Sequence, residues 1–341
     1  KEAAVLATVC LLSLFCFGCD AFQTGYLSAV RNNVAGLSKC TVNKNQFSLN
    51  VLPKPSFHSK SRYPSLIQMS TKTAVITGAS SGIGLAAAKE LTNKGWHVII
   101  AARSFSKAEI AAQTEGLPAG SFTVMPLDLA SLNSVRQFVN QIDTQPRQIN
   151  ALVCNAAVWY PRDTAPRFTA EGFEEHVGTN HLAHFLLAGL MVPKLKAADG
   201  FDPRVVFLGT DTHNPDSIAG KIPPQADLGE LSGLTGSDAL RGAKSMIDGK
   251  AFDPTKAYKD SKACNVLTMK EMHRRFASKG VTFSAIFPGC VAESPLFRDK
   301  RDWFRFIFPL FQKYITKQFV PVSEAGRRVA AVVSEEEFCN S

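Results

Sequence analysis

Short apolar runs separated by turn-forming residues recur along the chain, and they predict strands that alternate with helices. Residues 72–76 form a β-branched apolar run bounded by turn residues, and residues 85–91 have helical composition and spacing. Two more apolar runs, at 96–102 and 281–287, have the length of buried strands. We therefore expect an α/β fold, in which a doubly wound parallel sheet carries helices on both faces.

A glycine-rich turn joins the first predicted strand to the first predicted helix. Strand, turn and helix start together are the context in which backbone N–H groups and the positive helix end bind a pyrophosphate. The spacing departs from the G-x-G-x-x-G fingerprint, because three residues separate the first two glycines. A tight turn without a ligand is the alternative, and the context favours a dinucleotide. The residues assigned to this site are Gly78, Ser80, Ser81, Gly82, Ile83 and Gly84.

The residue that follows the second strand indicates which dinucleotide binds. Arg103 stands where an Asp or Glu would bind the ribose 2′-hydroxyl of NAD, and an Arg accommodates a 2′-phosphate. We therefore expect NADPH as the cofactor. Lys107, one helical turn further on, would add a second positive charge, although an exposed lysine without a role is the commoner case. Asp128 ends a third apolar run, where the adenine would lie.

A tyrosine and a lysine four residues apart, Tyr258 and Lys262, are the strongest candidates for chemistry. On a helix they share one face about 5 to 6 Å apart, so the ammonium would lower the pKa of the phenol towards working pH. A tyrosine of this kind is a proton donor. Such pairs also arise by chance on solvated helix faces, and the glycine motif upstream is what favours a functional role.

Taken together, residues 72 to about 334 resemble the short-chain dehydrogenase/reductase family, whose sheet is of the Rossmann type. Besides the motifs above, the match rests on Asn155-Ala156-Ala157 after the fourth strand, on Asn180 and on Thr210 after the fifth. Each of these has an ordinary explanation, as a strand cap, a satisfied helix asparagine or a β-branched strand residue. Five matches in the right order make coincidence improbable.

The resemblance implies a role for each matched residue. Tyr258 would transfer the proton, while Lys262 would lower the pKa of Tyr258 and bind the nicotinamide ribose. Thr210 stands at the position of the family's catalytic serine. Asn180 would hold a proton-relay water, and Asn155 with Ala156 would support the floor of the cofactor site.

A long segment separates Thr210 from Tyr258, far longer than is usual in that family. Residues 213–254 are rich in Gly, Pro and Asp, a composition that is usual in functional lids or disordered segments. Their repeated apolar residues favour an ordered insertion before the catalytic helix. We therefore expect one catalytic domain, residues 71–341, that carries this insertion.

Longer runs narrow the resemblance to the light-dependent NADPH:protochlorophyllide oxidoreductases. Those runs are residues 152–158, 179–187, 222–224, 245–249, 257–262, 265–276, 287–290 and 311–317. This resemblance implies that NADPH reduces the C17–C18 double bond of protochlorophyllide to chlorophyllide. Light absorbed by the bound pigment would activate the step, Tyr258 would protonate the second carbon, and neither flavin nor metal would take part.

Cys290 follows the strand at 281–287, at the sheet edge where doubly wound folds bind ligands. The resemblance implies that it lines the pigment pocket together with Tyr258, whereas a small buried thiol is the alternative. Residues 297–319 interleave aromatics with Arg and Lys, which favours a lid over the pigment with incidental membrane affinity. Nucleic-acid binding is not expected, because no nucleic-acid motif accompanies the basic residues.

The net charge of +9 is concentrated near the N-terminus. Residues 3–17 form an apolar run of signal-peptide length, too short to span a membrane, and no acid occurs from Ala21 to Lys89. We expect a signal-like segment at 1–20 and a transit-like segment at 21–70, a two-part address for a plastid in which Phe22 follows the cleavage point. A disordered tail is the rival, and the first methionine is Met69.

Several expectations concern the chain as a whole. The cysteines outside the extension show no metal or disulfide spacing, so we expect reduced thiols. The family would add a strand and a helix after residue 334, so we expect a truncated or diverged C-terminus. Self-association and peripheral attachment to plastid membranes are compatible with the sequence. Two other functions stay open: a dark reductase of a lipophilic carbonyl such as a retinoid or steroid, and a non-catalytic NADPH sensor or pigment holder.

Overall fold

The computed structural model describes residues 71–198, 200–234, 246–297, 308–310, 312–316 and 319–339. The expectations for the two targeting segments at residues 1–70 lie outside the described residues, and so does the part of the expected lid at 298–307.

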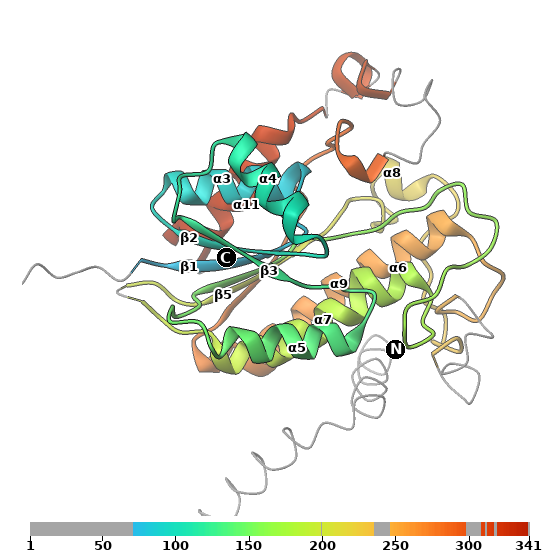
Figure 1. Cartoon of the computed structure of the whole chain (residues 1–341). Helices are drawn as coiled ribbons and strands as arrows, with labels where there is room; N and C mark the ends of the chain where they lie inside the picture. Colours follow the sequence, from blue (N-terminus) through green and yellow to red (C-terminus); the bar gives the residue numbers. More distant parts are fainter. Residues whose placement is uncertain are drawn as a thin grey trace, which may run out of the picture. The chain divides into compact units, whose positions relative to one another are not determined.

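Six parallel strands form one sheet in the order β3-β2-β1-β4-β5-β6 (Figure 1). The first described strand, β1, lies in the middle of this sheet. The chain then adds β2 and β3 on one side of β1, and β4, β5 and β6 on the other side. The strand order therefore reverses between β1 and β4, the point where doubly wound sheets bind ligands. The strands are β1 (Thr73–Thr77), β2 (His97–Ala102), β3 (Phe122–Pro126), β4 (Ala151–Cys154), β5 (Arg204–Leu208) and β6 (Thr282–Ile286).

Helices cover both faces of the sheet, which confirms the predicted fold class (Figure 1). One layer holds α3 (Gly82–Asn93), α4 (Phe105–Glu115) and α11 (Val322–Ser334), and the other holds α5 (Leu132–Ile142), α7 (Ala183–Met191) and α9 (Pro254–Phe276). Strands covered on both faces need apolar side chains throughout, which is why these runs do not alternate. The short elements are α6 (Glu175–Val177), α8 (Ile218–Lys221), η1 (Gly178–Leu182), η2 (Val192–Lys194), η4 (Ala277–Lys279), η5 (Pro295–Phe297), η6 (Gln312–Thr316) and η7 (Glu336–Cys339).

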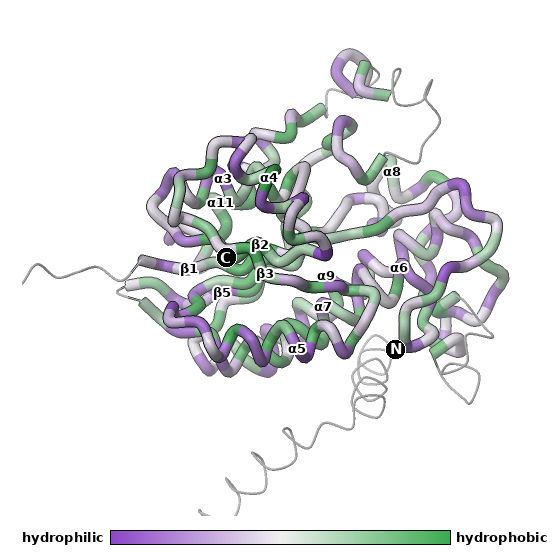
Figure 2. The backbone as a smooth tube through the Cα atoms, viewed as in Figure 1, coloured by the Kyte–Doolittle hydropathy of each residue, from purple (hydrophilic) through white to green (hydrophobic). Residues whose placement is uncertain are grey.

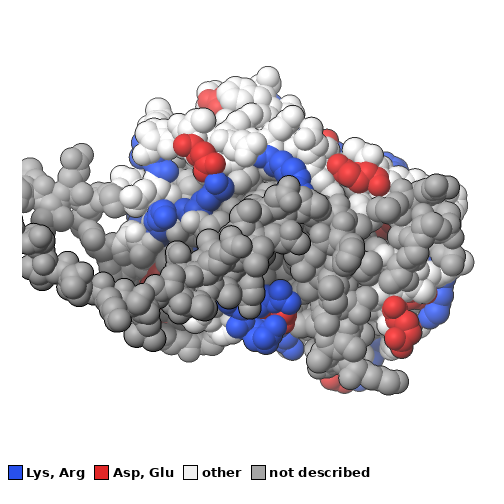
Figure 3. Space-filling view, turned by 90° about the horizontal axis from the view of Figure 1, so that it is seen from below, with Lys and Arg blue, Asp and Glu red and all other residues white. Residues whose placement is uncertain are grey.

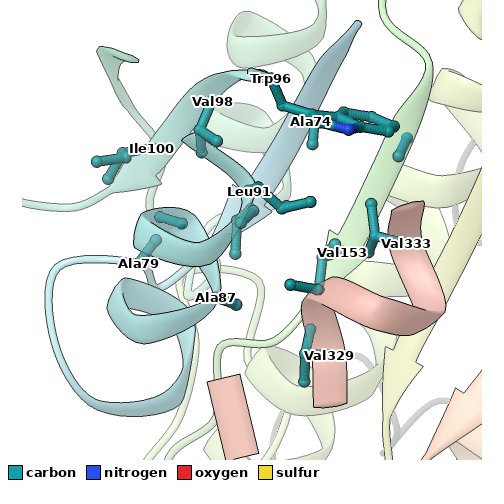
Figure 4. Close-up of a cluster of buried hydrophobic side chains, with 14 of the residues drawn as sticks. Ala74, Ala79, Ala87, Leu91, Trp96, Val98, Ile100, Val153, Val329 and Val333 are labelled. Carbon is teal, nitrogen blue, oxygen red and sulfur yellow. The ribbon is translucent and has the colours of Figure 1, made fainter. Parts of the chain in front are cut away.

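One core cluster lies between the sheet and the α3–α11 layer (Figure 4). Leu91 from α3 and Val329 from α11 meet Val153 from the sheet, and all three are fully buried. The two helices approach closely at Gly326, where an added Cβ would lie 2.5 Å from the Cβ of Ala86. Truncating a buried leucine such as Leu91 to alanine would cost about 2–5 kcal/mol. Among the described residues, hydrophobic stretches follow the strands and alternate with hydrophilic stretches along the helices (Figure 2).

Helix α9 begins at Pro254, so the predicted insertion ends one residue earlier than expected. The carboxylate of Asp253 accepts hydrogen bonds from the backbone N–H groups of Thr255 and Lys256, both at 2.8 Å, and Pro254 occupies the first helical position. This N-cap satisfies donors that have no partner within the helix. The described parts of the insertion form α8 and hydrogen-bonded turns, including a bond from Gly233 N to Ile247 O of 2.9 Å.

The surface of the described residues mixes both signs of charge. On the face seen from below, small groups of Lys and Arg lie beside small groups of Asp and Glu (Figure 3). Within the described ranges, no helix is long and apolar enough to cross a membrane. A search of the same ranges finds no cluster of three or more His, Cys, Asp and Glu side chains suited to a metal ion.

Candidate active site

Two glycines of the turn between β1 and α3 pack too closely against the residues that follow β4 to carry a side chain. Gly78 has φ +67°, and an added Cβ would lie 2.8 Å from the Cβ of Ala156. At Gly84 an added Cβ would lie 2.5 Å from Nδ2 of Asn155. Ser81 caps α3 without a side-chain hydrogen bond, so the first N–H groups of the helix keep their capacity for an anion. The turn therefore fits a pyrophosphate.

Thr77 joins the ends of β1 and β4 beneath that turn. Its Oγ1 accepts hydrogen bonds from the backbone N–H groups of Asn155, at 2.9 Å, and Ala156, at 3.0 Å. The amide of Asn155 donates in return to the carbonyl of Thr77, at 2.7 Å. The structure thus places Asn155 and Ala156 directly below the glycine turn, where the floor of the cofactor site was expected.

Three further cofactor candidates lie after neighbouring strands, at the same edge of the sheet. Arg103 follows β2 and is exposed, and Lys107 is exposed in the first turn of α4. Asp128 follows β3 and is half-buried; its Oδ1 accepts the N–H of Ala130 at 3.0 Å. Ser80 and Ile83 are half-buried in the glycine turn itself. The sequence predictions therefore converge on one edge, although their contacts with a cofactor stay predictions.

Tyr258 and Lys262 share the buried side of α9, as their spacing predicts. The ammonium nitrogen of Lys262 lies 6.0 Å from the centre of the Tyr258 ring. It donates a hydrogen bond to the carbonyl of Leu208 at the end of β5, at 2.9 Å. Burial lowers the pKa of Lys262 to about 8. Helix α9 is thus tied to β5 at the residue that flanks the candidate proton donor.

The expected acidification of Tyr258 is wrong for this structure. Burial raises the pKa of Tyr258, and the nearby Asp211 and Cys290 raise it further. The ammonium of Lys262, whose nitrogen lies 6.0 Å from the ring centre, does not reverse this shift. The phenol is therefore neutral at pH 7 and keeps the proton that a donor must have.

Asn180 lies in the π-helical turn η1 and packs against α9. Its Oδ1 accepts from Val158 N at 2.7 Å, and its Nδ2 donates to Val158 O at 3.0 Å and to Ser261 Oγ at 3.1 Å. Its carbonyl accepts from His184 Nδ1 and Asn265 Nδ2, both at 3.0 Å. These bonds leave one lone pair of Oδ1 to accept a hydrogen bond from a relay water. The relay role of Asn180 stays a prediction.

Thr210 and Cys290 follow β5 and β6, but their surroundings differ. The hydroxyl of Thr210 lies 3.2 Å from that of Thr212 and accepts the N–H of Thr212 at 3.3 Å, so it is engaged within its own loop. Burial, followed by the charge of Asp211, raises the pKa of Cys290 to about 11, so its thiol is neutral. Because Asp211 raises the pKa of both Tyr258 and Cys290, these three residues lie near one another.

Sequence reasoning missed Asp211 and three residues of α9 that hold the insertion. Lys259 donates to the carbonyl of Ile222 at 2.7 Å, at the end of α8. Asp260 accepts the N–H of Asp227 at 2.9 Å and pairs with Lys256 at 2.6 Å. The available signal was the run of charged residues beside Tyr258 on a helix that is otherwise buried. From sequence alone, such a run is interpreted as a solvent-exposed helix face, because only the folded structure shows the insertion packed against it.

Comparison with known proteins agrees with the fold. The short chain dehydrogenase family matches residues 72–213. In fold the chain is similar to 3-ketoacyl-(acyl-carrier-protein) reductase from Brucella melitensis, solved in complex with NADH, with a TM-score of 0.57 and 20% identity over 80% of this chain and 94% of that one. The six-stranded parallel sheet and this family match define the class of the chain as a short-chain dehydrogenase/reductase.

Two curated relatives then narrow the class. The chain is 50% identical to "Protochlorophyllide reductase, chloroplastic" of Chlamydomonas reinhardtii, over 85% of this chain and 74% of that protein. It is 52% identical to the protein of the same name from Marchantia paleacea, over 82% of this chain and 61% of that protein. The chain belongs to the protochlorophyllide reductase family.

Proposed function

We propose that this chain catalyses the light-driven reduction of protochlorophyllide by NADPH, a step of chlorophyll synthesis. The observation that carries the proposal is the buried Tyr258–Lys262 pair on α9, at the sheet edge that also carries the glycine turn, in a chain about half identical to reductases named for that substrate. Reduction of the C17–C18 double bond needs one hydride and one proton. The fold offers a neutral phenol for the proton.

NADPH fits the residues at the sheet edge. The uncapped N-terminus of α3 and the glycine backbone at Gly78, Gly82 and Gly84 suit the pyrophosphate, and Arg103 suits a 2′-phosphate. Asp128 would lie beside the adenine, and Lys262 would bind the nicotinamide ribose. When bound, NADPH supplies the hydride. The chain itself orients the reactants, excludes water and holds the proton.

Tyr258 would deliver its proton to carbon. Burial keeps the phenol neutral, and the ammonium of Lys262 on the same helix face stabilises the phenolate once the proton has left. Cys290 would line the pigment side of the site as a neutral thiol, with Asp211 close to both. Thr210 and a water on Asn180 would contribute to proton relay.

The same resemblance supports a plastid location. Both relatives above are named chloroplastic, and the N-terminal 70 residues have the two-part targeting composition described from sequence. Peripheral attachment to plastid membranes and self-association belong to this proposal as well. The basic aromatic residues between 297 and 319 are the segment from which membrane affinity would arise.

The decisive experiment mixes the purified chain with NADPH and protochlorophyllide, and records absorption in darkness and after single flashes. A red-shifted product band that appears only after light supports the proposal. Product formed from a retinoid or steroid carbonyl in darkness would instead establish the dark reductase. Binding of NADPH and pigment without any conversion would establish the holder.

A further inference from the structure

A row of aromatic rings begins at the candidate proton donor. The indole of Trp159 stacks on the ring of Tyr258, with centroids 5.2 Å apart and planes 26° apart. The ring of Phe297 makes a T-shaped contact with the indole, with centroids 5.7 Å apart and planes at 78°. Phe297 in turn lies 5.5 Å from Phe308. Trp159 therefore joins α9 to the aromatic segment that follows β6.

The chain on both sides of Trp159 is fixed by buried polar side chains. Val158 exchanges two backbone hydrogen bonds with the side chain of Asn180, at 2.7 and 3.0 Å. The N–H of Tyr160 donates to Nε2 of His176 at 3.1 Å, and Nδ1 of His176 pairs with the buried Glu174 at 2.5 Å. These contacts hold the backbone on both sides of Trp159 and so fix the point from which the indole reaches the phenol.

Stacking at one face and a cation at 6.0 Å together restrict the ring of Tyr258. A tyrosine side chain turns about two bonds, and a proton donor loses efficiency when its oxygen is misplaced by as little as one ångström. Offset stacks of aromatic rings are worth about 0.5–1.5 kcal/mol beyond the area they bury. That is enough to favour one ring orientation severalfold.

We propose that Trp159 is a positioning residue for the proton donor, whose stacked indole holds the phenol of Tyr258 in the orientation from which its proton leaves. This inference rests on the proposed function, since it concerns the same proton transfer. An aromatic side chain that merely fills space is the competing explanation. The two explanations predict different losses in a variant. Loss of a side chain that only fills space affects folding and binding, whereas loss of a positioning residue affects conversion of the bound complex.

The test compares variants that lack the ring with one that keeps it. Trp159→Leu and Trp159→Met remove the stack, and the flexible methionine fills more of the volume in case the leucine variant is unstable. Trp159→Phe retains an aromatic face. Phe168→Leu is the matched control, because Phe168 lies on the same loop but is 45% exposed. Each full-length variant is assayed for dark binding of NADPH and pigment, for the KM of the pigment and for product formed per flash per bound complex.

We expect product per flash to fall about tenfold in Trp159→Leu and Trp159→Met, while the KM of the pigment changes by less than about threefold. Trp159→Phe should recover to within about threefold of the wild type, and Phe168→Leu should match it. The proposal is overturned if the ringless variants convert bound pigment as fast as the wild type, or if they lose only binding. A wild-type chain that forms no product under light overturns both this proposal and the proposed function.

Discussion

At the scale of single residues, the proposed chemistry depends on the hydroxyl of Tyr258. Tyr258→Phe keeps the ring that stacks on Trp159 and removes only the proton donor. We expect NADPH and pigment to bind with nearly unchanged affinity, and product per flash to fall about a hundredfold or more, the usual contribution of a general acid. Dark difference spectra measure binding and flash absorbance measures conversion. Wild-type turnover in this variant would remove Tyr258 as the donor.

Arg103 is the residue on which the choice of dinucleotide is expected to depend. Arg103→Glu replaces a guanidinium suited to a 2′-phosphate with a carboxylate that would accept hydrogen bonds from the ribose hydroxyls of NADH. Because a hydrogen bond to a charged group is worth about 1.5–3 kcal/mol, the preference for NADPH over NADH should fall about ten- to hundredfold. Titration with each dinucleotide gives the ratio. Lys107→Ala is the companion variant: an unchanged ratio would make Lys107 an ordinary exposed lysine.

Motifs predicted part of this site, and physical context explains the rest. Tyr258, Lys262 and Asn155 are recognisable because short-range spacing places them on one helix face or at one strand end. Trp159 carried no such signal, because a single aromatic after an apolar run resembles core. The raised pKa of Tyr258 was also beyond prediction, since it depends on burial and on Asp211, which comes close only after folding.

At the scale of elements, two sets of side chains on α9 have different roles. Tyr258 and Lys262 face the site, whereas Lys256, Lys259 and Asp260 hold the insertion. Composition predicted an ordered insertion, but its anchors could not be predicted, because they are mainly backbone groups of residues 219–227 that accept or donate bonds to α9. The loop that carries Asp211 leads directly into α8, so the placement of the insertion bears on the substrate side of the site.

Removing the ammonium of Lys259 tests that link. Lys259 is 4% exposed and donates to the carbonyls of Ile222 and Ala219, at 2.7 and 3.4 Å. Lys259→Met would leave these acceptors without their donor, so we expect a loss of about 1–3 kcal/mol in the free energy of unfolding. The KM of the pigment should rise severalfold, while NADPH affinity stays constant. Lys270→Met, at an exposed position of the same helix, is the control. An equal change in both variants would contradict the anchoring role.

At the scale of the whole molecule, the order of apolar runs was sufficient to predict the parallel sheet, the bounds of β1, β2 and β6 to within one residue, and helices on both faces. The reason is that strands buried on both faces leave a strong local signal. The buried polar groups of the helical layer left no such local signal in the sequence. The pairing of His181 with Asn265, at 3.1 Å, and of His184 with Thr77, at 2.9 Å, joins residues about 80 to 110 positions apart in the sequence.

Those two histidines predict how stability depends on pH. Burial lowers the pKa of His181 and of His184 to about 4, from an ordinary value of 6.5. His184 is neutral with its proton on Nδ1, which donates to the carbonyl of Asn180, so Nε2 accepts from the hydroxyl of Thr77. Because the folded pKa lies below the unfolded one, the unfolded chain binds protons first. Stability is therefore complete above about pH 6.5 and is lost as the pH falls towards 4.

At pH 5 each histidine should cost roughly 2 kcal/mol of folding free energy. We expect the urea midpoint to be constant between pH 7 and 8 and to fall steadily below pH 6.5. His181→Gln and His184→Gln keep an amide donor but cannot titrate, so each should be less stable at pH 7 and yet lose less stability between pH 6.5 and 5. Burial raises the pKa of Asp260 to about 6, so this carboxyl also titrates in the window, but it is the same in variant and wild type, and the difference between them isolates each histidine. Variants that retain the full wild-type slope would show that the pH dependence arises elsewhere in the chain.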